Sequence, residues 1–194
     1  MHPSRSAFAL HARLLNSAGI ELWPAPLLRA RASADARILA RAHTVLRRKR
    51  DGRYLAAVLD QGLWPLVPRL AREAGIGPAL DLLDQQHAGL WRGPPPAPGE
   101  LPLERLHERL ALVAEPQWLA LAGFDRWRRP LWLRPGAARA WRAMQRAAAL
   151  DGVALDAISG YRSHDYQLGI FERKLARGLS IDDILAVHAA PGYS

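Results

Sequence analysis

The sequence predicts an α+β fold, with a helical N-terminal region followed by a mixed C-terminal region that contains a small antiparallel sheet. Apolar residues recur at helical spacing through residues 1–92, whereas the short apolar runs 118–121 and 129–133 have the length of strands. The segment 93–99 between them contains four Pro and two Gly, which cannot continue a helix. We therefore place a helical region at 1–92, a linker at 93–99 and a second region at 100–194.

Each helix of the first region is predicted from its apolar spacing and from the residue that ends it. The first helix spans residues 7–18 and ends at Gly19. A second helix begins at Ser33, an N-capping residue type, and ends in the basic run Arg47-Arg48-Lys49-Arg50. Three further helices are expected at residues 54–59, 66–74 and 78–90.

The second region is predicted to begin with a helix at 103–113. The runs 118–121 and 129–133 follow and are expected to pair as a hairpin. A helix then begins at Pro135 and ends at Gly152. The remaining elements are a short strand at 153–158, a helix at 165–177 and a last helix with Ser180 as its N-cap, which ends before Pro191.

Composition limits the chemistry and leaves a binding function open. The chain has no Cys, so disulfides and thiolate metal ligands are excluded, and any metal requires His and carboxylate ligands. The net charge is +9, and residues 1–92 contain fourteen Arg or Lys against seven Asp or Glu. This excess and the basic run 47–50 suggest a binding module for a polyanion such as nucleic acid, anionic lipid or acidic wall polymer. Arginines on amphipathic helices are more often simply solvated, so nucleic acid is not favoured as a partner.

The sequence contains no apolar run of the length that a membrane-spanning helix needs. The first eleven residues also lack the uninterrupted apolar core of a signal peptide. By sequence alone we expect a cytoplasmic location and no transmembrane segment. The oligomeric state cannot be deduced from these features.

The strongest functional signal is a set of spaced motifs in the last third of the chain. Ser159-Gly160-Tyr161-Arg162-Ser163 is followed by Gln167 and then by Pro191-Gly192-Tyr193-Ser194. Several matches in one order are stronger evidence than a lone Ser-Gly-Tyr-Arg. From about residue 131 to 194 the pattern resembles the VanY-type D-alanyl-D-alanine carboxypeptidases. The resemblance implies a hedgehog-like DD-peptidase core, a peptidoglycan stem peptide ending in D-alanine as substrate, and a location in the cell envelope.

The resemblance also assigns roles to three residues. Arg162 would be catalytic and substrate-binding, because a guanidinium stays charged and presents a rigid fork of donors to a developing oxyanion. Gln167 and Ser194 would hydrogen-bond the stem peptide from opposite walls. Without the resemblance, Arg162 would be read as a surface arginine and Gln167 as a solvated helix position.

Zinc is the cofactor that the resemblance implies, held by two His and one Asp with a Glu as general base. In the resemblance these positions follow Ser194, so we expect the chain to be truncated before the zinc ligands, to bind no zinc and to be inactive. His164 and Asp165 are adjacent on a turn and form a poor candidate for a zinc site. Two alternatives stay open, a pseudoenzyme that binds wall peptides without cleaving them and the basic module for a polyanion.

Overall fold

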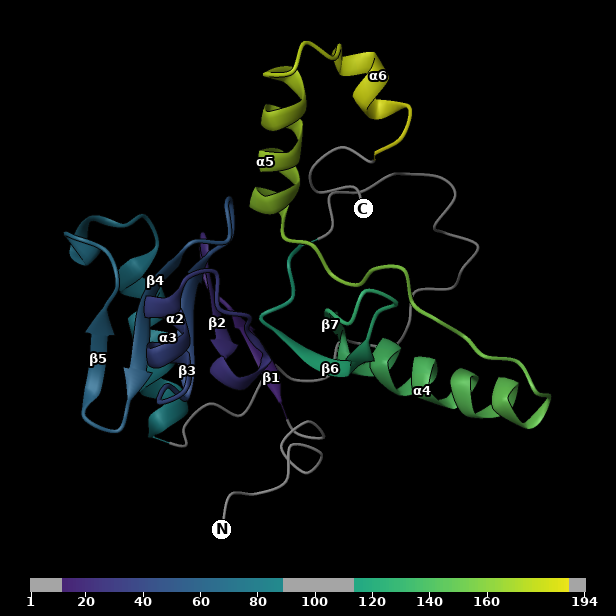
Figure 1. Cartoon of the computed structure of the whole chain (residues 1–194), viewed down its shortest axis with the longest axis horizontal. Helices are drawn as coiled ribbons and strands as arrows, with labels where there is room; N and C mark the ends of the chain where they lie inside the picture. The colour runs from purple at the N-terminus through teal and green to yellow at the C-terminus, as the bar shows by residue number, and fades with distance from the viewer. Residues whose placement is uncertain (1–11, 89–113, 189–194) are drawn as a thin grey trace.

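The computed structural model of the protein describes residues 12–88 and 114–188, which form a seven-stranded antiparallel sheet with helices around it (Figure 1). The strand order is β5-β4-β3-β2-β1-β6-β7. The strands are β1 (Arg13–Asn16), β2 (Ile20–Pro24), β3 (Thr44–Arg48), β4 (Tyr54–Leu59), β5 (Gly62–Pro65), β6 (Trp118–Phe124) and β7 (Pro130–Leu133). The α-helices are α2 (Ser33–Leu39), α3 (Ile76–His87), α4 (Pro135–Leu150), α5 (His164–Leu175) and α6 (Ile181–Leu185), with 3-10 turns at Ala25–Leu27 and Leu70–Arg72.

These elements confirm the α+β class, but the prediction that the N-terminal region is all helical is wrong. Residues 12–65 contribute five strands that run as a meander, and residues 54–59, expected to be a helix, are the fully paired strand β4. The apolar run of β4 has no polar face, because α2 packs on one side of the sheet and α3 on the other. A continuous apolar run of this length fits a buried strand and a buried helix equally well.

The predicted helix from Ser33 to the basic run is also too long. α2 covers only its first seven residues, and β3 occupies Thr44–Arg48. Val45 packs into the cluster beneath α2, whereas Leu46 packs into the cluster beneath α3, so the two neighbours point to opposite faces. Hydrogen-bonded ladders with β2 and β4 on both sides outweigh the helical spacing of the local sequence.

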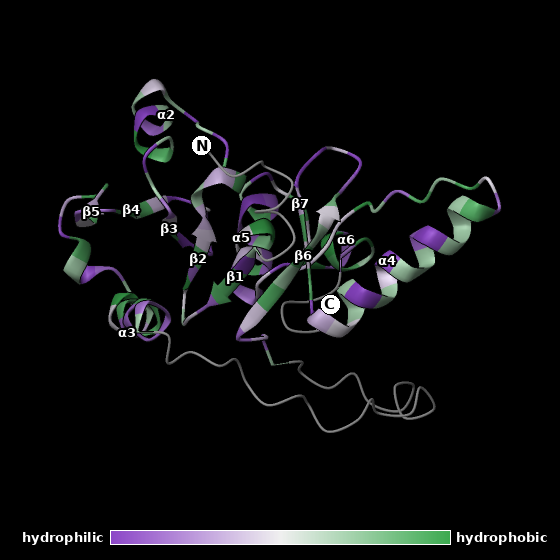
Figure 2. Cartoon of the chain, turned by 90° about the horizontal axis from the view of Figure 1, so that it is seen from below, coloured by the Kyte–Doolittle hydropathy of each residue, from purple (hydrophilic) through white to green (hydrophobic). Residues whose placement is uncertain are grey.

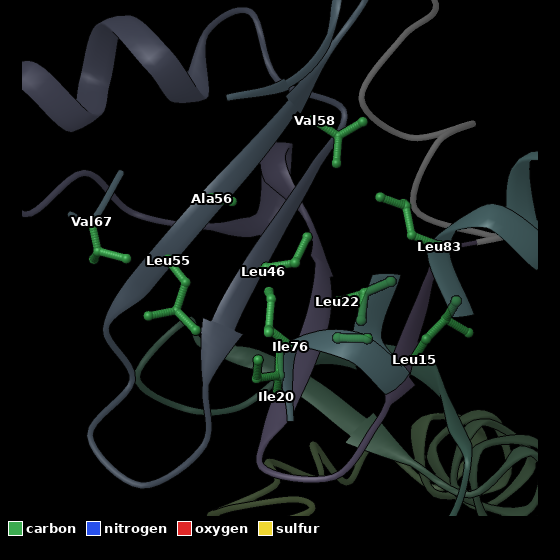
Figure 3. Close-up of a cluster of buried hydrophobic side chains, with 11 residues drawn as sticks. Leu15, Ile20, Leu22, Leu46, Leu55, Ala56, Val58, Val67, Ile76 and Leu83 are labelled. Atoms are coloured by element: carbon green, nitrogen blue, oxygen red, sulfur yellow. The ribbon is translucent and has the colours of Figure 1, made fainter. Parts of the chain in front are cut away.

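The main core lies between the sheet and α3. Figure 3 shows side chains from β1 to β4 converging with Ile76 and Leu83 of α3. Leu46, Leu55 and Ile20 are fully buried there. The helix predicted at 78–90 is therefore confirmed as α3, which supplies one wall of this core.

In the second region most of the predicted elements are confirmed. β6 and β7 form the expected hairpin, α4 begins at Pro135, and Ser180 caps α6. The strand predicted at 153–158 is wrong, because these residues adopt neither helix nor strand. Two hydrogen bonds tie this segment to the β6–β7 turn: the Arg126 N–H donates to the Ala157 carbonyl at 2.9 Å, and the Arg129 guanidinium donates to the Ile158 carbonyl at 3.1 Å.

The sheet continues across the position predicted to divide the chain, because β1 pairs with β6. The linker 93–99 and the helix predicted at 103–113 lie outside the described residues, and the division of the chain there stays a prediction. Within residues 12–88 and 114–188, no helix has the length and apolar character needed to cross a bilayer.

α4 extends beyond the edge of the sheet, as Figures 1 and 2 show from two directions. Its polar and apolar residues alternate around the helix in Figure 2. Ala138 is the buried residue of this helix, and it packs against Ala122 of β6 and Leu131 of β7. The hairpin and the start of α4 thus form a second, smaller core that supports the motif segment.

Candidate functional site

The segment Ser159–Ser163 lies against strand β7, and its glycine permits that contact. A Cβ atom on Gly160 would lie 2.7 Å from the carbonyl oxygen of Trp132 and 2.9 Å from a methyl group of Leu131. The next residue, Tyr161, donates its backbone N–H to the same Trp132 carbonyl at 2.9 Å. Glycine at this position therefore allows the motif to reach the sheet without forming a strand.

The second serine of the motif begins helix α5. Ser163 is buried, and its Oγ accepts a hydrogen bond from the backbone N–H of Tyr166 at 3.2 Å. This is an N-cap, which satisfies a donor that the first helical turn leaves unpaired. Because Gly160 and Ser163 are both fixed, the backbone of Arg162 is held between a strand and a helix N-terminus.

Arg162 lines a small pocket between β7, the motif and the first region. Its volume is about 160 Å³, which suits the end of a ligand better than a whole one. The lining residues are Leu14, Glu21, Trp23, Arg47, Asp125, Arg129, Pro130, Trp132, Ser159, Gly160, Tyr161, Arg162, Ser163 and Tyr166. The pocket is therefore walled by residues from both regions of the chain.

The three guanidinium groups of the pocket differ in their partners. Arg47 donates to the Glu21 carboxylate at 2.8 Å, and Arg129 donates to the Asp125 carboxylate at 2.6 Å. Burial by itself would raise the pKa of Asp125, but hydrogen bonds from Arg129 and its backbone amide lower it. Within the described residues Arg162 has no carboxylate partner, and its side chain is exposed. Arg162 is thus the lining cation that is available to an anionic or carbonyl oxygen of a ligand.

An aromatic pair lines the pocket, with Trp23 from the first region and Trp132 from β7. Trp23 and Trp132 meet edge to face with ring centroids 5.4 Å apart, and the Arg47 guanidinium lies 5.2 Å from the Trp23 ring centroid. The Glu21 carboxylate accepts from both the Trp23 indole at 2.6 Å and Arg47. Sequence analysis missed these residues, although one signal was present, since Glu21 stands inside an otherwise apolar run.

Of the other two predicted site residues, Gln167 is described by the structure and does not line this pocket. Gln167 is buried in α5, only 3% exposed, and is not among the lining residues. The solvated helix position considered for Gln167 is therefore wrong. Ser194 and the rest of the Pro191–Ser194 motif lie outside the described residues.

The described residues do not fit a zinc ion. Within residues 12–88 and 114–188, no three His, Asp or Glu side chains gather into a group that could hold a metal. His164 and Asp165 belong to no such group among these residues. No metal-dependent step is therefore assigned to these residues.

The basic run is occupied by internal ion pairs. Arg47 pairs with Glu21, Arg48 with Asp51 and Glu73, Lys49 with Glu115, and Arg50 with Glu172. Each of the four cations thus has a carboxylate partner in the described structure. The basic run is therefore paired within the fold, and the basic module for a polyanion stays an alternative.

One comparison with known proteins matches the part of the chain that supplies β7 and the motif segment. Residues 130–194 match VanY, the D-alanyl-D-alanine carboxypeptidase family. The match begins at the first residue of β7 and includes Arg162, Gln167 and Ser194, which confirms the resemblance indicated by the motifs. No curated protein and no solved structure matches the chain. At the level of the family, the VanY match supports a peptidoglycan-related peptidase.

Proposed function

We propose that this protein binds the D-alanyl-D-alanine end of peptidoglycan stem peptides, with Arg162 as the residue that contacts its oxygen atoms. The single observation that carries the proposal is the Arg162 guanidinium, which lines a pocket and has no carboxylate partner among the described residues. The VanY match over residues 130–194 supplies the substrate class. In this proposal the fork of donors binds the scissile carbonyl oxygen and would stabilise negative charge that develops there.

The size and walls of the pocket support a small terminal group as ligand. A volume of about 160 Å³ suits the side chain and carbonyl group of one small residue. Trp23 and Tyr161 supply apolar surface beside the cation. We propose that the remaining stem peptide lies outside this pocket, and the contacts assigned by resemblance to Gln167 and Ser194 stay predictions.

The proposal is tested by calorimetric titration of the full chain with diacetyl-Lys-D-Ala-D-Ala. We expect Arg162→Ala to weaken binding at least tenfold, because it removes a charge-assisted hydrogen bond. Arg162→Lys should recover only part of the affinity, since an ammonium lacks the planar fork. The matched control is Arg177→Ala, which removes an exposed arginine just beyond α5 and should leave binding unchanged.

Two results would reject this function. One is equal affinity of the wild type for the peptide ending in L-Ala-L-Ala, which would show that the site does not select the D configuration. The other is unchanged binding by Arg162→Ala. Zinc dependence and turnover are separate from the peptide binding proposed here. The expectation that this chain releases no D-alanine stays a prediction, and measurable zinc-dependent release from the pentapeptide stem would contradict it.

A further inference from the structure

A buried ion pair connects the first region of the sheet to the motif segment. Lys49 follows β3, is 3% exposed, and donates from Nζ to the Glu115 carboxylate. The other oxygen of Glu115 accepts the backbone N–H of His164, the first residue of α5. One carboxylate therefore binds the end of β3 and the N-terminus of α5 together.

The same network reaches the motif through its tyrosine. Asn16, at the end of β1, donates to the Tyr161 hydroxyl at 3.2 Å and to the Pro116 carbonyl at 2.7 Å. Burial, and then the negative charges of Glu115 and Glu21, raise the pKa of Tyr161 above its ordinary value of 10.0. Tyr161 is thus held as a neutral phenol between Asn16 and Glu115, one residue before Arg162.

The turn after β3 also lies directly against the middle of α5. A Cβ atom on Gly169 would lie 2.5 Å from the carbonyl oxygen of Arg50, so the helix approaches this turn very closely. The Arg50 guanidinium pairs with Glu172 one turn further along the helix. Lys49 and Arg50 therefore hold two successive parts of α5 from the same turn.

These contacts matter because the motif segment has no regular structure of its own. Residues 153–163 adopt neither helix nor strand, so the direction of Arg162 depends on the groups that fix its neighbours. Tyr161 and His164 flank Arg162 and Ser163, and both are held by the network around Glu115. If either Lys49 or Glu115 is removed, the other charge is left buried without a partner, which destabilises the folded protein.

We propose that Glu115 and Lys49 are positioning residues, which lie outside the VanY match and direct Arg162 into the pocket by fixing both sides of it. This inference rests on the proposed function, which identifies the ligand that binds Arg162. It assigns the first region a role in that site, because Lys49 belongs to the turn after β3. Preorganisation by surrounding groups of this kind is what holds a binding side chain in its productive geometry.

The test compares Glu115→Gln with Glu73→Gln in the full chain. Glu73 is the matched control, because it also pairs with a cation of the basic run and its side chain is 19% exposed against 20% for Glu115. Hydrogen exchange is measured for peptides that cover residues 159–167, and binding of diacetyl-Lys-D-Ala-D-Ala is measured by calorimetry. We expect Glu115→Gln to speed exchange in this segment and to weaken binding, each at least tenfold. Glu73→Gln should change each less than twofold.

Three further variants keep the test decisive if Glu115→Gln does not fold. Glu115→Asp retains the charge but shortens the side chain, so exchange in 159–167 should rise by a smaller factor. Lys49→Arg retains a cation, so it should keep more of the protection of residues 159–167 against hydrogen exchange than Lys49→Met does. If exchange in 159–167 is unchanged in Glu115→Gln, or rises equally in Glu73→Gln, the positioning role is wrong.

The two proposals fail in different ways. If the wild type does not bind the peptide, the proposed function is rejected, whereas the exchange comparison still decides whether Glu115 and Lys49 fix the segment. If the wild type binds and Arg162→Ala weakens binding, but Glu115→Gln leaves binding and exchange unchanged, the function is supported and the positioning role is rejected.

Discussion

The first region, residues 12–88, and the second region, residues 114–188, differ in how they bury their apolar side chains. The first exposes two large apolar residues among those described, Leu63 and Trp64. The second exposes twelve, which are Phe124, Trp127, Met144, Leu150, Val153, Ile158, Leu168, Leu175, Leu179, Ile181, Leu185 and Val187. The region that carries the VanY match therefore buries its own apolar surface less completely than the region without it.

The second region is attached to the first through the sheet and through ion pairs. β6 extends the sheet by pairing with β1, and Leu119 of β6 packs with Leu14 of β1 in a shared cluster. The Lys49–Glu115 and Arg50–Glu172 pairs add two further connections. The part of the chain that matches VanY, residues 130–194, is thus contacted by residues of the first region, which precede it in the sequence.

The largest expected effect comes from a core substitution in the first region. Leu46→Ala should lower the free energy of unfolding by about 3 kcal/mol, because Leu46 is fully buried between the sheet and α3. The matched substitution Leu150→Ala, at a side chain that is 90% exposed, should change it by less than about 0.5 kcal/mol. Urea denaturation measures both. Equal losses would remove the contrast between the two regions.

An intermediate effect is expected where the motif touches the sheet. Gly160→Ala would place a methyl group 2.7 Å from the Trp132 carbonyl, so the backbone must shift at a cost of about 1–3 kcal/mol. Because the shift displaces Arg162, affinity for the D-Ala-D-Ala peptide should also fall. Gly136→Ala is the control, since a Cβ there meets no atom within 4 Å among the described residues. Unfolding and peptide titrations that do not separate the two variants would contradict the close packing of the motif.

The smallest effect concerns a carboxylate that pairs within the first region only. A hydrogen bond from Arg48 lowers the pKa of Asp51 from its ordinary value of 3.8 to about 2. The contribution of the Asp51 carboxylate to the free energy of unfolding is therefore complete above about pH 4 and is lost as the pH falls toward 2. Asp51 is 45% exposed, so Asp51→Asn should cost less than about 1 kcal/mol at pH 7.

The check on this pair is a set of denaturation curves between pH 7 and pH 2. The stability difference between the wild type and Asp51→Asn should shrink as the pH approaches 2. Exchange in residues 159–167 should be the same in both proteins, because the Arg48–Asp51 pair does not contact the motif segment. A constant difference down to pH 2 would show that the pair does not titrate as described.

Local sequence determined those elements that have their own start and end signals. Pro135 begins α4, Ser180 caps α6, and the apolar runs on either side of a turn form the β6–β7 hairpin. The motif around Arg162 was also recognisable from residue types and their order. In these cases neighbours in sequence provide the capping groups and turn residues that decide the conformation.

Tertiary structure decided the first region and the completion of the site. Residues 54–59 are a strand because β3 and β5 pair with them and α3 covers them, which their own apolar run does not specify. Likewise, Glu21 lines the pocket with the motif, and Lys49 is linked to the start of α5 through Glu115, only by contacts between residues that are far apart in the sequence. The sequence by itself determined the motif and the residues that are predicted to carry its chemistry. Only long-range pairing and burial determined which groups surround Arg162.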